Sequence, residues 1–458
     1  MATAARTQQG SQRPQLLQAA YNAIFQPDIR EKLLFTFALL VIFRFVSHVP
    51  VPGTNPAALD QIFQDSTVLG FLNIFSGGAL QNMSVAAMGV YPYITSSIVM
   101  QLMVPLVPTL QALSREGEQG RRQIQIYTHW MTVPMALVQA YGQLVLIESQ
   151  GGFAGTAGIG LTGEQTIPTV SMIVSMCAGT MFLVWLGELI SEKGIGNGIS
   201  ILIFAGIIAG LPQYVAGQLY TGTGDTITST IMLGGLMIAL VYLIVIFNEA
   251  QRRIPVQYSR SVFRSGRMYR QSGSTHIPLK VNTVGMIPLI FAFSIIIFPA
   301  YVGSIFATSS NEFIADTATW LQNVFDPGNW GYWVFLFITV VVFTFFYTLV
   351  VFQQQNLSEN LQRQGGFVPG IRPGRPTEEY INRVLMRITW GGAFFLGFIA
   401  IAPFIFSAII GGDFALSGRS AAFGITSTGL IIVVGVVLDT MRQIEAQLLM
   451  RQYEGFIR

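Results

Sequence analysis

Ten long apolar segments constrain the fold of this chain more than any other feature of its sequence. Each has about the 20 residues that a helix needs to cross a bilayer. Most carry no formal charge, and the exceptions are Arg44 within the first segment and Glu188 near the end of the fourth. None alternates with the period of two that a lipid-facing barrel strand requires. The sequence therefore predicts an all-α polytopic membrane protein with ten transmembrane helices, at about 33–49, 84–107, 124–147, 167–190, 199–219, 229–247, 281–304, 331–352, 388–410 and 420–438.

The composition excludes a water-soluble protein and offers little for catalysis. Charged residues make up 10% of the 458 residues, whereas soluble domains have about 25%. A single cysteine, Cys177, excludes a disulfide framework, and the three histidines lack metal-ligand spacing. The run Gly194–Gly198 lacks the Lys-Ser/Thr ending of a phosphate loop, so it predicts a tight turn between two helices. We expect no cofactor, no metal site and no enzymatic activity.

The distribution of charge predicts the orientation in the membrane. Of the 25 Lys and Arg residues, 23 lie in the terminal regions or in the loops that follow even-numbered segments. The loops that follow odd-numbered segments carry nine acidic residues. Because basic residues concentrate in cytoplasmic loops, we expect a multi-pass protein of the cytoplasmic membrane with both termini in the cytoplasm.

The polar loop 211–228 divides the ten segments into five and five. With an odd number of spans in each half, the second half must enter the membrane from the opposite side, which is the geometry of inverted repeats. The expected divisions are a cytoplasmic amino-terminal arm at 1–30, a first half at 31–210, an extracytoplasmic hinge loop at 211–228, a second half at 229–441 and a cytoplasmic tail at 442–458.

Two of the expected cytoplasmic loops, 248–280 and 353–387, are long and basic. One interpretation is attraction to anionic lipid. The other is a docking surface for a large, negatively charged partner. Lipid attraction needs only a short basic cluster, so the length of the two loops favours docking.

A shorter apolar segment, at about 65–78, lies between the first two spans. It is too short to cross the membrane and too apolar for an exposed loop, so it is either re-entrant or lies on the membrane surface. Arg44 must face a partner, a watery cavity or the interface, because a charge facing lipid is costly. The span centres otherwise lack ionisable groups. This favours a channel closed by aliphatic side chains over the alternative, an ion-coupled secondary transporter.

Six sequence blocks resemble the SecY family, the channel-forming subunits of the bacterial Sec protein translocase. They occur in the family's order within residues 30–455. The blocks are VPVPG at 49–53, FLNIFSGGALQNMSVAAMGVYPYITSSIVMQ at 71–101, REGEQGRR at 115–122, GTMFLVWLGELISEKGIGNGISILIFAGIIAGLP at 179–212, STHIPLKVN at 274–282 and GGFVPGIRPGRPT at 365–377.

The resemblance implies a clamshell of two inverted five-helix halves around a central channel. Unfolded polypeptides would pass through the channel, and apolar segments would leave it laterally into the lipid between the second and seventh spans. The implied pore ring consists of Val90, Ile94, Ile199, Ile203, Ile290 and Ile432. The implied plug helix on the extracytoplasmic side contains Phe71, Leu72, Asn73, Ile74, Phe75, Ser76, Gly77 and Gly78.

The resemblance also implies partners. The SecA motor ATPase or a translating ribosome would dock on the two basic loops, and SecE and SecG would accompany the chain as small membrane subunits. Polypeptides that bear signal sequences would be the substrates, and the lipid bilayer would receive their apolar segments. The implied docking residues are Arg372, Arg375, Arg264, Arg267 and Arg270.

Overall fold

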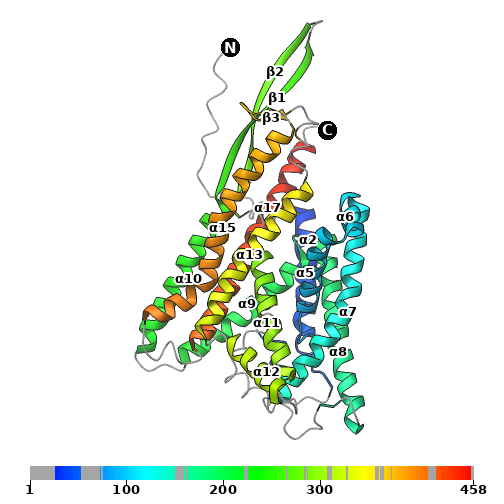
Figure 1. Ribbon diagram of the computed structural model, residues 1–458, viewed down its shortest axis with the longest axis vertical. Coiled ribbons are helices and arrows are strands. Elements are labelled where there is room, and N and C mark those ends of the chain that lie inside the picture. The colour runs from blue at the N-terminus through cyan, green and yellow to red at the C-terminus, as the bar shows by residue number, and fades with distance from the viewer. Residues whose placement is uncertain are drawn as a thin grey trace.

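The computed structural model describes residues 26–454, apart from 53–72, 74–75, 150–158, 161–162, 221–224, 265–266, 283–284, 286, 307–311, 326–328, 356–360, 362–365, 373 and 411–418. This part of the chain contains twelve α-helices, one short 3₁₀ helix and three strands. The helices form an elongated bundle, and a long β-hairpin projects from one end of it (Figure 1).

Each of the ten apolar segments overlaps one helix. These are α2 (Pro27–Val46), α5 (Tyr91–Leu106), α7 (Glu118–Ser149), α8 (Thr166–Lys193), α9 (Gly198–Tyr220), α10 (Asp225–Glu249), α11 (Ile287–Phe306), α13 (Trp330–Gln355), α15 (Arg375–Ile410) and α17 (Arg419–Glu454). Within the described residues, four helices, α7, α8, α13 and α15, are long and apolar enough to cross a membrane. The number rises to five if α5 and the bent helix that follows it form one span.

Three helical elements had no counterpart among the expected spans: α6 (Pro108–Arg115), η1 (Gly163–Gln165) and α12 (Glu312–Val324). The axis bends by 97° between α5 and α6. The bend occurs at Val107, whose backbone is extended at φ −100° and ψ 115°. Because Pro108 disfavours helical backbone at the residue before it, the proline ends α5 and starts α6 in a new direction.

The two basic loops contain β-structure, so the expectation of an all-α chain is wrong for this part. Strands β1 (Gln251–Arg264) and β2 (Arg267–Lys280) form an antiparallel ladder of fourteen residue pairs. The short β3 (Gly366–Phe367), from the second loop, pairs with β1 on its other edge. Near the base of β1, Ile254 and Val256 are buried while their neighbours face solvent, which is the alternation of a half-buried strand.

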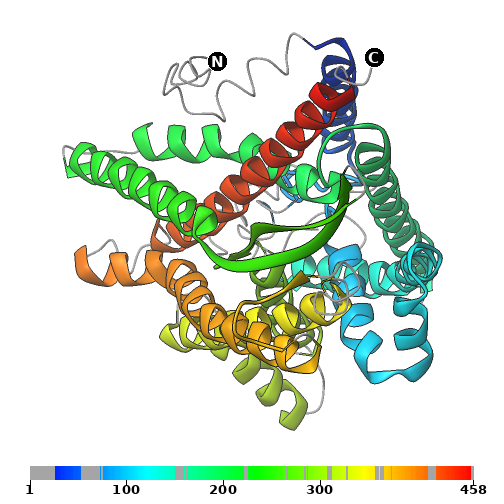
Figure 2. The same cartoon turned by 90° about the horizontal axis from the view of Figure 1, so that it is seen from above.

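A small apolar cluster joins the two basic loops into one unit. The hairpin contributes Ile254, Val256 and Leu279, the second loop contributes Leu361 and Val368, and α15 contributes Ile381. Seen from above, the hairpin crosses the middle of the helical bundle (Figure 2). The joined loops therefore form a single surface over the centre of the molecule.

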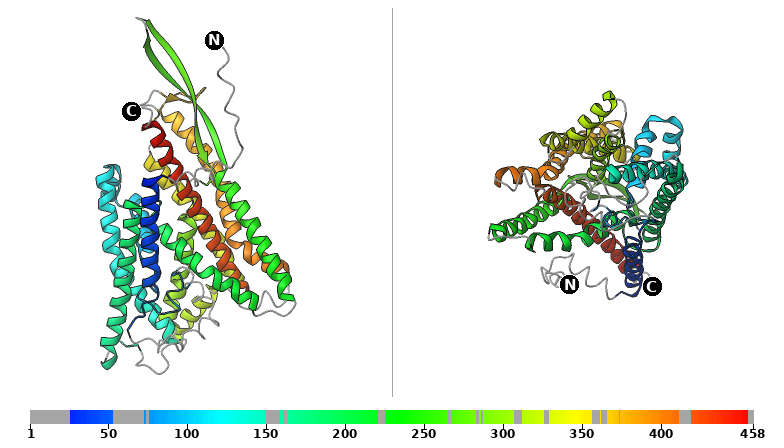
Figure 3. Two further views of the ribbon diagram at one scale, coloured as in Figure 1. Left: turned by 180° about the vertical axis from the view of Figure 1, so that it is seen from behind. Right: turned by 90° about the horizontal axis from the view of Figure 1, so that it is seen from below.

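The helical ends that were expected in the cytoplasm lie at the same end of the molecule as the hairpin (Figure 3). Ile29 at the start of α2, Ile195 in the α8–α9 turn and Ile444 in α17 pack together. At the base of the hairpin, Arg442 of α17 forms an ion pair with Glu249 of α10 at 2.6 Å. We call this end of the molecule the hairpin end.

The glycine-rich run between α8 and α9 forms the tight turn expected from the sequence. Gly196 has a positive φ of 86°, and the backbone N–H of Gly198 donates to Ser191 Oγ at 2.8 Å. A Cβ on Gly198 would lie 1.8 Å from the backbone oxygen of Gly187. Two glycines therefore let α8 and α9 approach closely and fix the position of the first turns of α9.

Candidate functional site

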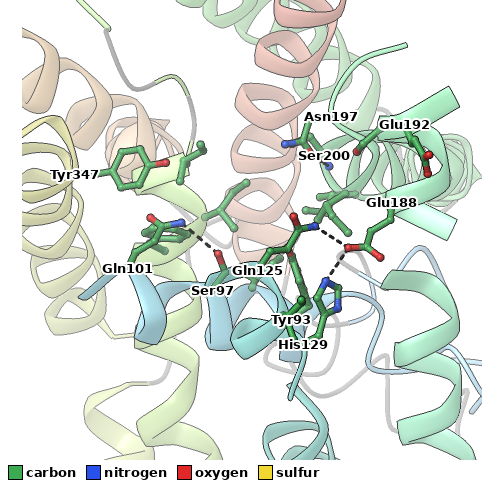
Figure 4. A pocket seen from close by; sticks show the side chains of 18 of the residues that line it. Tyr93, Ser97, Gln101, Gln125, His129, Glu188, Glu192, Asn197, Ser200 and Tyr347 are labelled. Carbon is green, nitrogen blue, oxygen red and sulfur yellow. Dashed lines mark hydrogen bonds and ion pairs between the residues drawn. The ribbon is translucent and has the colours of Figure 1, made fainter. Parts of the chain in front are cut away.

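A central cavity of about 880 Å³ lies between α5, α7, α8, α9, α11 and α13 (Figure 4). Its lining combines polar and aliphatic side chains. The polar group comprises Tyr93, Ser97, Gln101, Arg122, Gln125, His129, Glu188, Ser191, Glu192, Asn197, Ser200 and Tyr347. The apolar group comprises Ile94, Ile126, Ile199, Ile203, Ile287, Ile290 and Phe291. The cavity includes Asn197 of the α8–α9 turn, so it reaches the hairpin end of the bundle.

The structure brings four of the six implied pore-ring residues to this cavity: Ile94 of α5, Ile199 and Ile203 of α9, and Ile290 of α11. These elements are far apart in the sequence, so the meeting of their side chains is a tertiary feature. Val90, at the amino end of α5, and Ile432 of α17 do not line the cavity. Both are buried in the main apolar core that also contains Ile94, Ile203 and Ile290.

A polar cluster on the cavity wall was not anticipated from the sequence. The Oε1 atom of Glu188 lies 2.7 Å from His129 Nε2 and accepts a hydrogen bond from Gln125 Nε2, also at 2.7 Å. The Tyr93 ring lies 5.6 Å from the His129 ring, centroid to centroid. Gln125 and His129 are four residues apart and therefore share one face of α7. This spacing, together with the acidic Glu188 in the largely apolar α8, is the sequence feature that could have indicated the cluster.

The described part of the implied plug lies beyond the cavity, away from the hairpin end. A Cβ on Gly77 would lie 2.8 Å from Gly206 Cα of α9. Gly206 is three residues after Ile203, so it lies on the next turn of the same helix face. The chain at Gly77 therefore passes α9 one turn beyond Ile203, on the side away from the hairpin end.

Hydrogen bonds within this segment hold it in a series of turns. Asn73 Oδ1 accepts from the backbone N–H of Gln81 at 2.9 Å. The Ser76 hydroxyl donates to the Asn73 carbonyl at 2.9 Å and accepts from the Leu80 N–H at 3.1 Å. Residues 76–78 of the implied plug form turns where a helix was expected, and residues 85–90 form turns where the second span was expected to be helical. Phe71, Leu72, Ile74 and Phe75 of the implied plug lie outside the described residues.

Arg44 faces a partner, which is one of the three surroundings expected for it. Its Nη1 atom donates to the Gly77 carbonyl at 2.6 Å. The charged group of the first span thus contacts the backbone of the segment that passes below the cavity.

Side-chain hydrogen bonds connect the helices on one side of the cavity. The Tyr91 hydroxyl of α5 donates to the Ser294 carbonyl of α11 at 2.7 Å. Gln139 of α7 donates to Thr95 Oγ1 of α5 at 3.1 Å. The contact between α5 and α11 is the boundary between the implied second and seventh spans.

The comparison with known proteins agrees with this geometry. The sequence model of the SecY family matches residues 84–441. The chain belongs to the SecY family. It is 41% identical to the protein translocase subunit SecY of Streptomyces coelicolor, over 97% of this chain and all of that protein. The corresponding Thermotoga maritima protein is 40% identical over 96% of this chain and 98% of its own length.

Solved structures show the same fold at lower sequence identity. A structure described as a protein conducting channel aligns with a TM-score of 0.58 at 17% identity, covering 92% of this chain and 93% of that one. A channel from a canine ribosome-channel complex of the endoplasmic reticulum aligns with a TM-score of 0.54 at 16% identity, over the same shares of the two chains. As a member of the SecY family, the chain is a membrane-embedded, protein-conducting channel subunit of a protein translocase, and its family is not one of enzymes.

The implied docking residues of this SecY family member lie at the hairpin end. Arg372 is exposed in a turn whose glycines, Gly370 and Gly374, have positive φ values of 84° and 101°. The Arg372 carbonyl accepts a hydrogen bond from Thr377 Oγ1 at 2.8 Å, and Arg375 is exposed at the start of α15. The ladder places Arg264 opposite Arg267, next to the hairpin tip, and Arg270 opposite Ser261. The side chains of these three hairpin arginines lie outside the described residues.

Proposed function

We propose that the chain forms a passive channel that carries unfolded, signal-sequence-bearing polypeptides across the cytoplasmic membrane of a bacterium, with energy supplied by a partner. The main support is the central cavity, whose lining combines polar side chains with the isoleucines Ile94, Ile203 and Ile290. Flexible aliphatic side chains can surround an extended peptide without specific hydrogen bonds, so many sequences can pass. When no peptide is present, a narrow apolar constriction closes by excluding water.

We propose the full architecture of ten transmembrane helices in two inverted five-helix halves, forming a clamshell hinged at 211–228. The overlap of all ten apolar segments with helices supports the number of spans. The positions of α2, α17 and the hairpin at one end support termini that both lie in the cytoplasm. Shorter apolar helices, such as 198–210 of α9, can reach across the membrane together with the residues that follow them.

Apolar segments would leave the channel between α5 and α11. The Tyr91–Ser294 hydrogen bond joins these helices, and Pro299 interrupts the hydrogen-bond ladder of α11. Separation of α5 from α11 along this boundary would open the channel toward lipid. A sufficiently apolar segment would then partition into lipid by its own transfer free energy.

The unit formed by the two basic loops is the proposed docking surface for SecA or a ribosome, with Arg372 as its central residue. The apolar cluster of Ile254, Val368 and Ile381 supports this proposal, because it holds both loops in one surface. Attraction to phosphate groups gives a ribosome contact its physical basis. SecE and SecG are the proposed membrane partners.

Reconstituted proteoliposomes test the proposed function. We expect the purified complex, supplied with SecA and ATP, to import an unfolded preprotein, and an ion gradient alone to drive no uptake of small solutes. Gradient-driven solute uptake without preprotein import would instead show the ion-coupled transporter. We also expect Ile203→Asn to raise the resting ion conductance. The control is Ile208→Asn on the same helix, because Ile208 is exposed on the bundle surface.

A further inference from the structure

The contact between Arg44 and the plug segment (residues 73 and 76–84 of the described chain) goes beyond the proposed pore and docking residues. Arg44 lies in the last turn of α2, within the first apolar span. Its guanidinium donates to a backbone carbonyl, that of Gly77, at 2.6 Å. A hydrogen bond from a charged donor is about twice as strong as one between neutral groups. The acceptor is main chain, so the contact depends on the path of the backbone at Gly77 and not on a side chain of the plug segment.

The plug segment is also tied to the residues that follow α2. The Val51 N–H donates to the Met83 carbonyl at 2.8 Å, and directly after the segment the Val85 N–H donates to the Val49 carbonyl at 2.9 Å. These two bonds hold the far end of the segment. Arg44 holds its near end, where the chain passes below the cavity.

The near end fits closely between α2 and α9. Gly77 has a positive φ of 71°, and a Cβ there would lie 2.8 Å from Gly206 Cα. A Cβ on Gly78 would lie 3.8 Å from Arg44 Nη1. The glycine thus contacts α9 on one side, and its carbonyl accepts from α2 on the other.

We propose that Arg44 is a positioning residue that holds the plug backbone against α9 below the pore ring and so keeps the resting channel closed. The inference rests on the proposed pore ring and plug and adds the group that retains the plug. When a polypeptide displaces the segment, the hydrogen bond from Arg44 to the Gly77 carbonyl breaks. The loss of this bond raises the free energy of the displaced state, so the displaced state is less populated at rest. Removing a hydrogen bond with a charged donor shifts the equilibrium between the seated and the displaced plug segment by about tenfold to a hundredfold.

The test compares Arg44→Gln and Arg44→Lys in the complete, membrane-reconstituted complex. Each also carries Ala79→Cys as a reporter, because Ala79 lies in the plug segment and is fully buried. The same complexes without the reporter correct for the native Cys177. We expect a membrane-impermeant maleimide, added from the extracytoplasmic side, to modify the reporter about tenfold to a hundredfold faster in Arg44→Gln. Lysine keeps the charge without the planar fork, so Arg44→Lys should give a smaller increase.

Two further measurements keep the test decisive. Arg30→Gln is the matched control, because Arg30 is exposed at the other end of α2, and it should leave the labelling rate unchanged. Resting ion conductance should rise in Arg44→Gln, while SecA-driven preprotein import is retained. Equal labelling rates in the parent, Arg44→Lys and Arg44→Gln complexes would overturn the inference. If Arg44→Gln fails to assemble, equal labelling rates in the parent and Arg44→Lys complexes would overturn it as well.

Deletion of residues 65–78 separates this inference from the plug itself. If the deletion raises resting conductance and Arg44→Gln does not, Arg44 is not the retaining group. If neither change raises conductance, the segment does not close the channel, and the inference about Arg44 fails with it. Gly77→Ala provides an independent route to the displaced state, since the added methyl group would collide with Gly206. It should raise labelling as Arg44→Gln does.

Discussion

Replacing Tyr91 by Phe should favour opening of the channel toward lipid. The substitution removes the hydroxyl that donates to the Ser294 carbonyl at 2.7 Å and keeps the aromatic ring at the start of α5. Ser294 lies inside α11, so its carbonyl also accepts a hydrogen bond within the helix. The change therefore leaves the Ser294 carbonyl with its helical partner and costs the closed state the net value of the Tyr91–Ser294 hydrogen bond.

That net value is about 0.5–1.5 kcal/mol, which shifts the balance between closed and open states by about two- to twelvefold. A leucine at the centre of a membrane segment contributes about 0.3–0.6 kcal/mol to insertion. The variant should therefore insert test segments that contain about two fewer leucines than the parent complex requires for insertion.

The assay uses a series of preproteins whose test segments contain increasing numbers of leucine, and it measures the fraction of each that is inserted into the membrane. Tyr93→Phe is the matched control, because Tyr93 is two residues further along α5 and lines the cavity next to His129. An unchanged insertion midpoint in Tyr91→Phe would refute the reasoning. A shift of equal size in Tyr93→Phe would do the same, since it would show that any loss of a tyrosine hydroxyl in this region suffices.

Three further predictions concern packing, titration and docking. Gly198→Ala should lower the thermal stability of the complex by several degrees in a melting experiment, because the new Cβ would lie 1.8 Å from the Gly187 oxygen. Burial raises the pKa of Asp439, just beyond the tenth span, above its ordinary 3.8, although Arg442 and Lys280 oppose the shift. A raised folded-state pKa stabilises the protein at low pH, and this stabilisation is lost as pH rises through that pKa. The melting temperature of the parent relative to Asp439→Asn should therefore increase as pH falls toward 4. Arg372→Glu should weaken SecA or ribosome binding at least tenfold in a binding assay at low salt, whereas Arg383→Glu, further along α15, should have a smaller effect.

The helices were predictable from the sequence because their cause is local. Long apolar runs must satisfy their backbone polar groups internally when they lie in lipid, and each run overlaps a helix. The bend at Val107 follows from Pro108, whose effect on the preceding residue is also local. The hairpin was not predicted from the sequence. The alternation of Ile254 and Val256 with exposed neighbours indicates a strand, but the many basic residues of the loop indicated only attraction to lipid or docking of a partner.

The site was less predictable because it is assembled from distant segments. An isoleucine in a membrane helix is unremarkable alone, and only the family resemblance singled out Ile94, Ile203 and Ile290 for a shared cavity. The contact of Glu188 with His129 depends on the relative rotation of α7 and α8, and no local pattern determines that rotation. In the same way, the sequence showed that Arg44 needed a partner, but the partner proved to be a backbone carbonyl.

The length of the hairpin determines which negative charges its arginines encounter. Fourteen paired residues at about 3.3 Å each give a ribbon about 45 Å long, and it projects away from the bundle (Figure 1). At physiological ionic strength, salt screens charges over about 8 Å. Arg264 and Arg267, at the far end of the ladder, therefore lie several screening lengths beyond the base of the hairpin. With the proposed orientation, anionic lipid headgroups near that base would be too far away to interact with charges at the tip, and the proposed docking partner would reach the tip through the solvent.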